Sequence, residues 1–412
     1  MSEWKEYKLG DLCEITSSKR VFYSEYVPFG VPFFRSKEII DLHNNRNIAT
    51  ELFISEDRYN EIRVKFGVPQ TDDILLTSVG SLGIPYKVKN GDRFYFKDGN
   101  LTWFRNIDKN SISPDYLMHW LCSSIGKQKL DEVTIGSTQP ALTISGLKSI
   151  DILLPPLAEQ ERIAGILSSL DDKIDLLTRQ NSTLESMAET LFRQYFIETT
   201  DTQSGKLGDY ITETTGGDWG KENCEDEFSK AVQCIRGTDI ADLNSGIATK
   251  TPIRFIKEVK FEKIEPRNGD LILEISGGTE TQSTGRVTYI NDDIKSLFDY
   301  PLVFSNFCRM LRIKDVRYSY FTYCYINYLY QQDEFFNLEN GSSGIKNLDY
   351  KALLFDLEYP MPKNEQAIDD FDVLVKPVFK KINKNKQQVR SLIKLRDSLL
   401  PKLMNREIII NG

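Results

Sequence analysis

Residues 157–197, LAEQERIAGILSSLDDKIDLLTRQNSTLESMAETLFRQYFI, form the stretch around which the rest of this chain is organised. Apolar residues recur along it in alternating steps of four and three, with one polar member, Asn181. The apolar members are Ile163, Leu167, Leu170, Ile174, Leu177, Leu184, Ala188, Leu191 and Tyr195. This spacing is the heptad pattern of a helix that packs along a second helix.

A second stretch, residues 366–406, repeats this spacing with Asn385 as its polar member and with Arg396 interrupting the row. Its apolar members are Phe371, Val375, Val378, Ile382, Val389, Leu392, Leu399 and Leu403. Because a lone amphipathic helix leaves its apolar stripe in water, we expect the two stretches to pair. Each follows a block of about 155 to 160 residues, so the chain has the order block, long helix, block, long helix.

Two asparagines and a proline also disturb the heptad pattern. An asparagine in such a row can fix the register of two helices, or it can lie at the solvent edge, which is what we expect for Asn181 and Asn385. Pro377 lies inside the second stretch. Because proline removes a backbone donor from a helix, it predicts a bend near residues 375–378.

The composition is that of a globular protein. At 412 residues the chain has room for two or three domains, and its hydrophobic content of 40% and charged content of 27% are ordinary. No apolar run approaches the ~20 residues of a membrane span, and the first ten residues, MSEWKEYKLG, are too polar for a signal peptide. We therefore expect a cytoplasmic location.

The cysteines and histidines exclude several kinds of site. The only histidines, His43 and His119, are far apart, and the six cysteines form no CxxC pair. A zinc site, a disulfide scaffold and Cys/His catalysis are therefore not expected. We expect reduced cysteines in or near cores. They are Cys13, Cys122, Cys224, Cys234, Cys308 and Cys324.

The net charge of -8 is unevenly distributed. It is zero over residues 1–150, -5 over 151–200, -7 over 201–363 and +4 over 364–412. Because affinity for DNA depends on the neutralisation of phosphates, any DNA-binding surface must be a local face on an acidic body.

The two blocks share a series of short motifs in the same order. KLGDL at residues 8–12 matches KLGDY at 206–210, and FRSKEI at 34–39 matches IRGTDI at 235–240. DILL at 73–76 matches DLIL at 270–273. Further matches are Asn100-Leu101 with Asn306-Phe307, Gly136-Ser137 with Gly341-Ser342, and Pro156, Glu159 and Gln160 with Pro362, Glu365 and Gln366. The offset stays between 197 and 206, which indicates an internal duplication.

Each block predicts a compact α+β domain. Short strand-like runs such as DILLTSV and DLILEIS alternate with turn signals, and one helix comes late in each block. Ser113-Pro114 is a good start for the first of these helices. The tyrosine-rich helix at residues 318–330 takes the same place in the second block, and we expect it to be domain core rather than a platform for stacked bases.

Segments rich in Gly, Ser, Thr and Gln interrupt the strands at residues 78–83, 136–139, 277–285 and 341–344. They are either ordinary hairpin turns or surfaces that, with nearby cationic residues, contact phosphates and bases. The candidate DNA-binding residues are Lys19, Arg20, Arg35, Lys37, Ser78, Ser81, Lys97, Gln139, Trp219, Lys221, Arg236, Thr279, Gln282, Arg286, Ser342 and Ser343.

Motifs for catalysis are missing from the sequence. There is no GxxxxGK[ST] loop, no GxGxxG after a strand and no Asn/Asp-Pro-Pro-aromatic tetrad. Glu258-Val259-Lys260 has the Glu-x-Lys form of some nucleases, but it lacks a convincing Pro-Asp before it. We therefore expect no catalytic residue and no metal. The alternatives are a stand-alone nuclease built around Glu258 and Lys260, or a coiled-coil adaptor that does not touch DNA.

Three motifs give the whole chain a resemblance to the specificity subunit of type I restriction-modification enzymes. They are LPPLAEQERIAGIL at residues 154–167, GSTQPAL at 136–142 and RDSLLPKLMNREI at 396–408. The second copy departs from the pattern, with PMPKNEQ at 360–366 where the first has PPLAEQ.

This resemblance implies an architecture. Residues 1–153 and 201–362 would be two similar α+β target recognition domains, related by a pseudo-twofold repeat, and each would read one half of a bipartite double-stranded DNA site. Residues 154–200 and 363–412 would be the central and distal spacer helices, packed as an antiparallel coiled coil. The residues expected in the spacer or at partner contacts are Glu159, Gln160, Ile163, Leu167, Leu170, Ile174, Leu177, Glu365, Gln366, Val378, Ile382, Val389 and Leu392.

The resemblance also implies partners and cofactors. Two modification subunits, which bind S-adenosylmethionine and methylate adenine, and two motor-nuclease restriction subunits would assemble with the chain. The chain itself would carry no cofactor, and ATP and magnesium would belong to the partner subunits. The expected function is therefore non-catalytic DNA sequence recognition.

Overall fold

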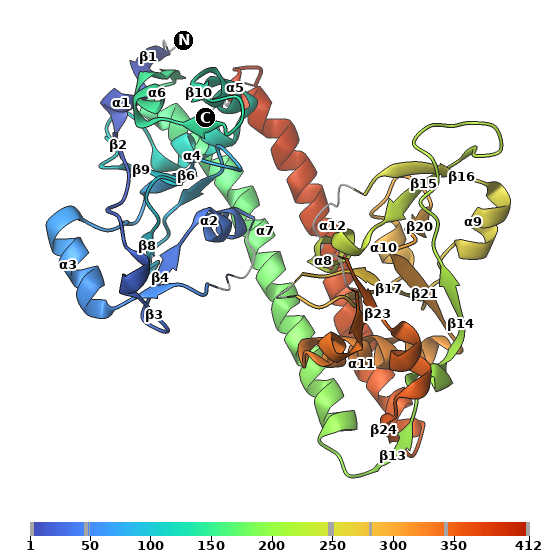
Figure 1. The fold of residues 1–412 in the computed structure, drawn as a ribbon. Coiled ribbons are helices and arrows are strands. Elements are labelled where there is room, and N and C mark those ends of the chain that lie inside the picture. The colour runs from blue at the N-terminus through green and yellow to red at the C-terminus, as the bar shows by residue number, and fades with distance from the viewer. Residues whose placement is uncertain are drawn as a thin grey trace. The chain divides into compact units, whose positions relative to one another are not determined.

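The computed structural model describes residues 4–44, 48, 50–245, 251–279, 282–341 and 345–408. The chain divides into two compact units, and each is considered by itself. Unit 1 comprises Met1–Asp175 and Ile393–Gly412, and unit 2 comprises Leu176–Leu392. Figure 1 labels their elements.

Unit 1 contains the first block of the chain and a segment of each long helix. Its elements are β1 (Lys5–Lys8), α1 (Leu9–Leu12), β2 (Glu14–Thr16), η1 (Tyr23–Glu25), β3 (Tyr26–Val27), β4 (Val31–Phe34), α2 (Ser36–His43), β5 (Phe53–Ile54), α3 (Glu56–Phe66), β6 (Ile74–Thr77), β7 (Pro85–Lys87), β8 (Tyr95–Phe96), β9 (Leu101–Arg105), α4 (Pro114–Cys122), α5 (Ser124–Glu132), β10 (Thr134–Ile135), β11 (Ala141–Leu142), α6 (Ile144–Ser149), β12 (Asp151–Leu154) and the start of α7 (Leu157–Phe192).

Two four-stranded sheets form the body of unit 1. One has the antiparallel order β2-β9-β6-β7, and the other has the order β3-β5-β4-β8 with β4 parallel to β8. A separate antiparallel pair, β1 with β12, joins the start of the block to the residues just before α7. This pair anchors the long helix to the domain that precedes it.

Unit 2 repeats this order of elements. They are η2 (Arg193–Ile197), β13 (Thr202–Gly205), η3 (Leu207–Tyr210), β14 (Ile211–Gly216), β15 (Lys230–Ile235), α8 (Gly237–Ser245), β16 (Ile253–Ile256), α9 (Glu258–Ile264), β17 (Leu271–Glu274), β18 (Ser276–Gly277), β19 (Val287–Tyr289), α10 (Asp292–Lys295), β20 (Leu302–Phe304), β21 (Cys308–Ile313), η4 (Val316–Tyr318), α11 (Ser319–Gln331), η5 (Glu334–Leu338), β22 (Glu339–Asn340), β23 (Lys346–Leu348), η6 (Ala352–Asp356), β24 (Tyr359–Pro362) and most of α12 (Gln366–Met404).

The main sheets of unit 2 share their strand order with those of unit 1, although the second sheet has three strands in unit 2 and four in unit 1. The order β14-β21-β17-β19 corresponds to β2-β9-β6-β7, and the parallel pair β15 and β20 corresponds to β4 and β8. The pair β13 with β24 occupies the place of β1 with β12. The expected internal duplication and the α+β class of both blocks are confirmed.

The shared motifs of the sequence correspond to shared local structure. Asp73 and Asp270, each just before a buried strand, are almost completely buried. Asp73 Oδ2 accepts a hydrogen bond from the backbone N–H of Gln70 at 2.9 Å, and Asp270 Oδ2 accepts one from Arg267 at 2.7 Å. A carboxylate that closes the turn in this way satisfies a backbone donor that would otherwise be buried without a partner.

The long helices pair in opposite directions inside each unit. In unit 1, Leu167 near the start of α7 belongs to the same core cluster as Leu403 near the end of α12. In unit 2, Phe192 near the end of α7 packs on Phe371 near the start of α12, with ring centroids 6.1 Å apart. The expected antiparallel coiled coil is confirmed, and α12 is continuous from Gln366 to Met404, Pro377 included.

The expectation that Asn181 and Asn385 lie at the solvent edge is wrong. Their side chains are 4% and 0% exposed, and Asn385 Nδ2 donates hydrogen bonds to Asn181 Oδ1 and Gln180 Oε1, both at 2.9 Å. The heptad row continues through both positions, so each side chain turns toward the partner helix rather than away from it. A buried amide needs a polar partner, and one polar atom of each asparagine finds it in the other.

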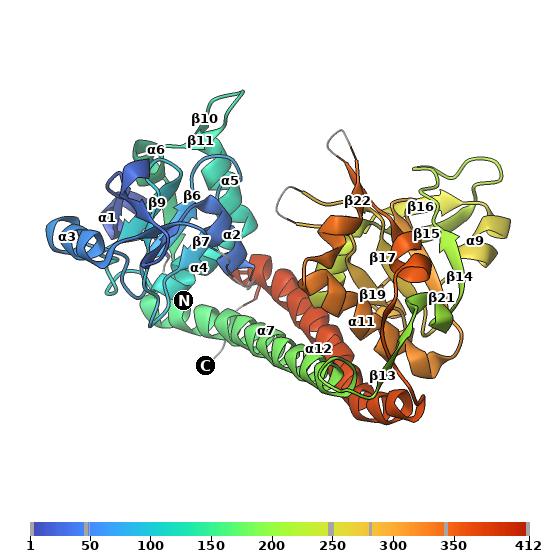
Figure 2. The same cartoon turned by 60° about the horizontal axis from the view of Figure 1, so that its bottom comes forward.

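The tyrosine-rich helix α11 is core, as expected. It packs between the β17-containing sheet of unit 2 and α12 (Figure 2), and Tyr320 stacks on Tyr289 and on Phe379 with ring centroids 4.6 and 4.5 Å apart. Tyr325 Oη donates a hydrogen bond to the Pro360 carbonyl oxygen at 2.9 Å. The aromatic side chains of this helix are therefore buried in the core of their own domain.

The cysteines follow the expectation with one exception. All six are free thiols; Cys224 is exposed and Cys122 is half-buried. The others, Cys13, Cys234, Cys308 and Cys324, are buried. Burial raises the pKa of the Cys13, Cys122, Cys234 and Cys308 thiols to about 12. The prediction that every cysteine lies in or near a core is wrong for Cys224, which lies in an exposed loop after Trp219.

Candidate nucleic-acid interface

A pocket of about 730 Å³ in unit 2 gathers five of the candidate DNA-binding residues. The five are Trp219, Arg236, Thr279, Gln282 and Arg286. Other residues complete its wall, and among them are Glu274, Ser305, Asn306 and Phe307. The pocket combines guanidinium, amide and hydroxyl groups with an aromatic ring that is half exposed, Phe307 at 48%. This chemistry suits the polar edges and apolar faces of nucleobases.

The ends of two parallel strands explain how this wall is assembled. In β15 and β20, Ile235 is paired with Phe304, and the Ser305 N–H donates a hydrogen bond to the Ile235 carbonyl oxygen at 2.9 Å. The next residue of each strand, Arg236 and Ser305, therefore lies at the same edge of the sheet. Both side chains line the pocket.

Unit 1 has the same arrangement with different side chains. Phe34 of β4 is paired with Phe96 of β8, and the Lys97 N–H donates to the Phe34 carbonyl oxygen at 2.9 Å. Arg35 and Lys97 consequently lie side by side, as Arg236 and Ser305 do in unit 2. Both units therefore present a cationic residue at the carboxyl ends of their parallel strands.

In each unit, an acidic residue binds the arginine that follows the parallel strand. Arg35 donates through Nη2 to Glu38 Oε1 at 2.8 Å, and its backbone N–H donates to Glu38 Oε2 at 2.7 Å. Arg236 donates through Nη2 to Asp239 Oδ1 at 2.8 Å and through its backbone N–H to Asp239 Oδ2 at 2.9 Å. Both acids are buried, at 1% and 4% exposure. These hydrogen bonds raise the pKa of both arginines, so the cations are permanent and fixed in direction.

Further cationic residues of unit 1 lie around the same strand ends. Arg20 pairs with Asp98, the residue after Lys97, at 2.9 Å. The Lys19 N–H donates to Tyr95 Oη at 2.7 Å, and the Lys19 ammonium lies 4.9 Å from the ring centroid of Phe66. The structure thus brings four of the candidate cations of unit 1 toward one edge.

The remaining candidates are placed as follows. Lys37, Ser81, Lys97, Gln139 and Lys221 are exposed. Lys221 does not line the pocket of unit 2 and pairs with Glu225 at 2.9 Å. Ser342 and Ser343 lie outside the described residues.

The prediction that Ser78 is a DNA-binding residue is wrong. Its side chain is 3% exposed, its Oγ is 2.6 Å from Thr102 Oγ1, and it donates a hydrogen bond to the Leu76 carbonyl oxygen at 3.2 Å. The residue follows β6 directly and remains under the sheet, so it stabilises strand pairing and offers no surface to a ligand.

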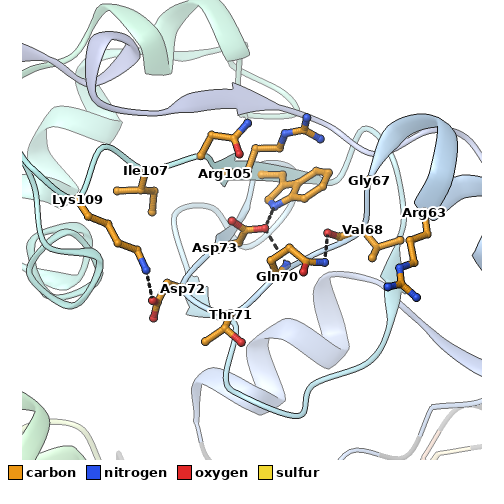
Figure 3. Close-up of a pocket in the computed structure, with 12 residues that line it drawn as sticks. Arg63, Gly67, Val68, Gln70, Thr71, Asp72, Asp73, Arg105, Ile107 and Lys109 are labelled. Carbon is orange, nitrogen blue, oxygen red and sulfur yellow. Dashed lines mark hydrogen bonds and ion pairs between the residues drawn. The ribbon is translucent and has the colours of Figure 1, made fainter.

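A second pocket, of about 480 Å³, lies in unit 1 and was not predicted from the sequence (Figure 3). Asp73 lies in it and accepts hydrogen bonds from the Gln70 N–H and from Trp103 Nε1, the second at 2.8 Å. Burial raises the pKa of Asp73. Lys109 pairs with Asp72 at 2.6 Å, and Arg105 pairs with Glu14 at 2.9 Å. Two of the cations at this pocket, Lys109 and Arg105, are thus paired with carboxylates, and the one sequence signal for the pocket was the Asp73 motif.

The Glu-x-Lys motif proves to be a surface feature. Glu258 begins α9 and pairs with Lys230 at 3.0 Å, and its side chain is 55% exposed. In the described part of the chain no group of three or more His, Cys, Asp or Glu side chains is arranged to hold a metal ion. No helix among the described residues has the length and apolar character of a membrane span.

The predicted spacer residues are mostly buried. The buried ones are Ile163, Leu167, Ile174, Leu177, Val378, Ile382 and Val389. Leu170 and Leu392 are half-buried. Arg396, which interrupts the second row, donates from Nη1 to Asp171 Oδ1 of α7 at 2.9 Å inside unit 1.

The matched Glu-Gln pairs differ between the copies. Gln160 is fully buried and donates to the carbonyl oxygens of Ser111 and Pro155 at 3.0 and 2.9 Å. Its Oε1 accepts a hydrogen bond from the Ser113 N–H at 3.0 Å. Gln366 is exposed and donates to Asp370 at 2.9 Å. Glu159 is half-buried, and Glu365 is exposed and accepts from Arg317 at 2.9 Å.

Comparisons with known proteins agree along the whole chain. A family model described as the type I restriction modification DNA specificity domain matches residues 1–186. The type I restriction enzyme MjaIX specificity subunit of Methanocaldococcus jannaschii is 25% identical over 98% of this chain and 94% of its own length. The HindI specificity subunit of Haemophilus influenzae is 24% identical over 99% and 100%.

A solved structure shares the fold. The S subunit of a type I restriction-modification system from M. genitalium superposes with a TM-score of 0.56 at 16% identity, over 98% of this chain and 96% of that one. These comparisons give no support to a stand-alone nuclease or to an adaptor. The domain match over residues 1–186, the end-to-end relatives and the confirmed duplication lead to one conclusion: over its whole length the chain is similar to the specificity subunits of type I restriction-modification systems.

Proposed function

We propose that this chain is the DNA sequence-specificity subunit of its system and recognises a bipartite double-stranded site. The observation that carries the proposal is the duplicated cationic turn, in which Arg35 and Arg236 occupy equivalent positions after parallel strands and are held by Glu38 and Asp239. Two domains of the same fold, each with such a turn, suit a site with two separate halves.

Two kinds of contact are expected of each domain. Cations that recur in both copies suit phosphate groups, because phosphates are the same whatever the base sequence. Side chains that differ between the copies suit base edges, because base edges differ from one base pair to another. We assign residues 1–153 and 201–362 as the two target recognition domains, with residues 154–200 and 363–412 as the spacer helices.

The long helices suit a second task, the assembly of partner subunits. We propose that two modification subunits and two restriction subunits join this chain, with the duplicated architecture offering each pair two similar docking surfaces. The partners would supply S-adenosylmethionine, ATP and magnesium. The assembly would work in the cytoplasm, where the chromosomal DNA is.

Mapping of methylated adenines in DNA from cells that carry this chain and its modification subunit tests the proposal. The expected result is one motif with two specified halves and a gap of fixed length. Deletion of this chain alone should abolish methylation at that motif, since the modification subunit would lose its guide to the site. A continuous motif, or methylation that persists without this chain, would reject the proposed function.

A further inference from the structure

A buried carboxylate and an arginine face each other across two neighbouring strands in the pocket of unit 2. Glu274 ends β17, and its backbone N–H donates to the Arg286 carbonyl oxygen at 2.8 Å. Arg286 Nε donates to Glu274 Oε2 at 2.9 Å, and Nη2 donates to Glu274 Oε1 at 2.6 Å. Glu274 is 1% exposed, and both residues line the pocket.

This geometry occupies one edge of the guanidinium and leaves another edge for a ligand. The Glu274 carboxylate accepts hydrogen bonds from Nε and from one N–H of Nη2. The Nη1 group donates to none of the described residues, so the outer edge formed by Nη1 and Nη2 is available at the pocket. Two parallel donors in a rigid fork fit the O6 and N7 acceptors of guanine in the major groove.

Unit 1 lacks this pair at the equivalent position. Thr77 ends β6, as Glu274 ends β17, and it pairs through its backbone with Ile84, as Glu274 pairs with Arg286. The Thr77 hydroxyl instead accepts a hydrogen bond from the Ile84 N–H at 2.9 Å. The position therefore differs in chemistry between two domains that share their backbone arrangement.

The surroundings of Glu274 are adapted to its size. A Cβ atom on Gly237 would collide with Glu274 Oε1, and one on Gly277 would come within 2.6 Å of it. In unit 1 the residue equivalent to Gly237 is Ser36, and the residue equivalent to Glu274 is the smaller Thr77. The glycines and the carboxylate thus form one arrangement specific to unit 2.

We infer that Arg286, held in place by Glu274, is a base-specifying residue of unit 2 and reads a guanine in its half-site. This inference rests on the proposed function. Arg35 and Arg236, which recur in both units, would contact phosphates and carry no sequence preference. The half-site read by unit 2 should therefore contain a G·C pair whose recognition depends on Arg286.

The test compares four versions of the complete methyltransferase complex on a DNA library with both half-sites randomised. They are the wild type, Arg286→Lys, Arg286→Gln and Arg312→Lys. Arg312 is the matched control, because it donates to the buried Asp270 at the other end of β17, and its side chain is 17% exposed against 18% for Arg286. It does not line the pocket.

Arg286→Lys should lower the preference for guanine over other bases at one position by on the order of 10- to 100-fold, with the other half-site unchanged. Arg286→Gln should move the preference at that position toward adenine, because a glutamine amide suits adenine N6 and N7. Arg312→Lys should leave the motif as it is. Each variant is also followed by thermal unfolding.

Three results would overturn the inference. They are a wild-type motif with no G·C pair in either half, an Arg286→Lys motif identical to the wild type, and a general loss of methylation with unchanged base preference. A wild-type complex that methylates without any bipartite motif would reject the proposed function instead. The two failures are thus distinguishable.

Discussion

Asn385 Nδ2 donates a hydrogen bond to Asn181 Oδ1 at 2.9 Å in the interior of unit 2, where α12 packs on α7. Among the described residues, Asn181 Nδ2 and Asn385 Oδ1 find no partner, although both atoms are buried. Burial of these two unpaired atoms therefore lowers the stability of the helix interface. The benefit of the pair is alignment, because the two amides meet only when the helices are in one register.

Removal of one amide should destabilise unit 2 more than removal of both. Asn385→Leu leaves the Asn181 amide buried without a partner, and we expect the free energy of unfolding to fall by about 1–3 kcal/mol. The double variant Asn181→Leu/Asn385→Leu buries an apolar pair and should recover that loss or exceed it. Chemical denaturation of the three proteins gives the comparison. Equal destabilisation by the single and the double variant would contradict the role of the pair.

Gln160 should matter for stability, whereas its sequence counterpart Gln366 should not. Gln160→Ala deletes three hydrogen bonds between a fully buried side chain and backbone groups of unit 1 at the start of α7, and we expect a loss of about 2–4 kcal/mol. Gln366→Ala removes one exposed contact with Asp370 and should stay within about 0.5 kcal/mol of the wild type.

Denaturation curves of these two variants at equal protein concentration provide the measurement. Because the two glutamines share one motif, a difference between them can come only from their structural settings. A similar cost for both would show that the motif itself, rather than the burial of Gln160, determines the effect.

Acidification should weaken unit 1 through His119. This side chain is 7% exposed, its Nε2 is 3.1 Å from Ser168 Oγ, and burial lowers its pKa despite the nearby Asp171 carboxylate. The unfolded chain, with a histidine pKa of about 6.5, then binds more protons than the folded chain below that pH. The free energy of unfolding should fall as the pH drops from about 6.5 through the lower folded-state pKa.

Thermal unfolding between pH 7.5 and 5.5 checks this sign. His119→Asn, which keeps a polar group near Ser168, should flatten the pH dependence. His43, whose pKa is also lowered by burial, should contribute in the same direction. An unchanged slope in the His119→Asn variant would show that other groups carry the acid sensitivity.

The length of the long helices should set the gap between the two half-sites. Residues 172–180 of α7 and 386–395 of α12 separate the Asp171–Arg396 pair from the Asn181–Asn385 pair along the sequence. Seven residues inserted into both segments keep the heptad register and add about 10 Å, roughly three base pairs at ~3.4 Å each. We expect a longer gap with unchanged half-sequences.

Methylation mapping measures this gap directly. Insertion into α7 alone is the control, because it shifts one helix against the other and should impair folding rather than lengthen the gap. If the complex with both insertions still methylates the original motif, the length of the helices does not set the gap.

Local patterns in the sequence determined the larger part of the fold. The heptad rows through Leu167 and Ile382 predicted two paired helices, because a stripe with that period must be buried against another helix. The colinear motifs around Asp73 and Asp270 predicted the duplication. Both signals depend on neighbours within one helix or one turn, and such neighbours are visible in a single sequence.

Only the tertiary structure decided which side chains are available to a ligand. Ser78 belongs to a polar segment yet lies under a sheet, and Asn385 was expected at the solvent edge yet is completely buried. Glu274 and Arg286 give no sign of each other in the sequence. They meet because β17 and β19 are adjacent, and Gly237, from a distant helix start, leaves room for the carboxylate. Periodicity specifies the elements, but contacts between distant segments specify the surface they build.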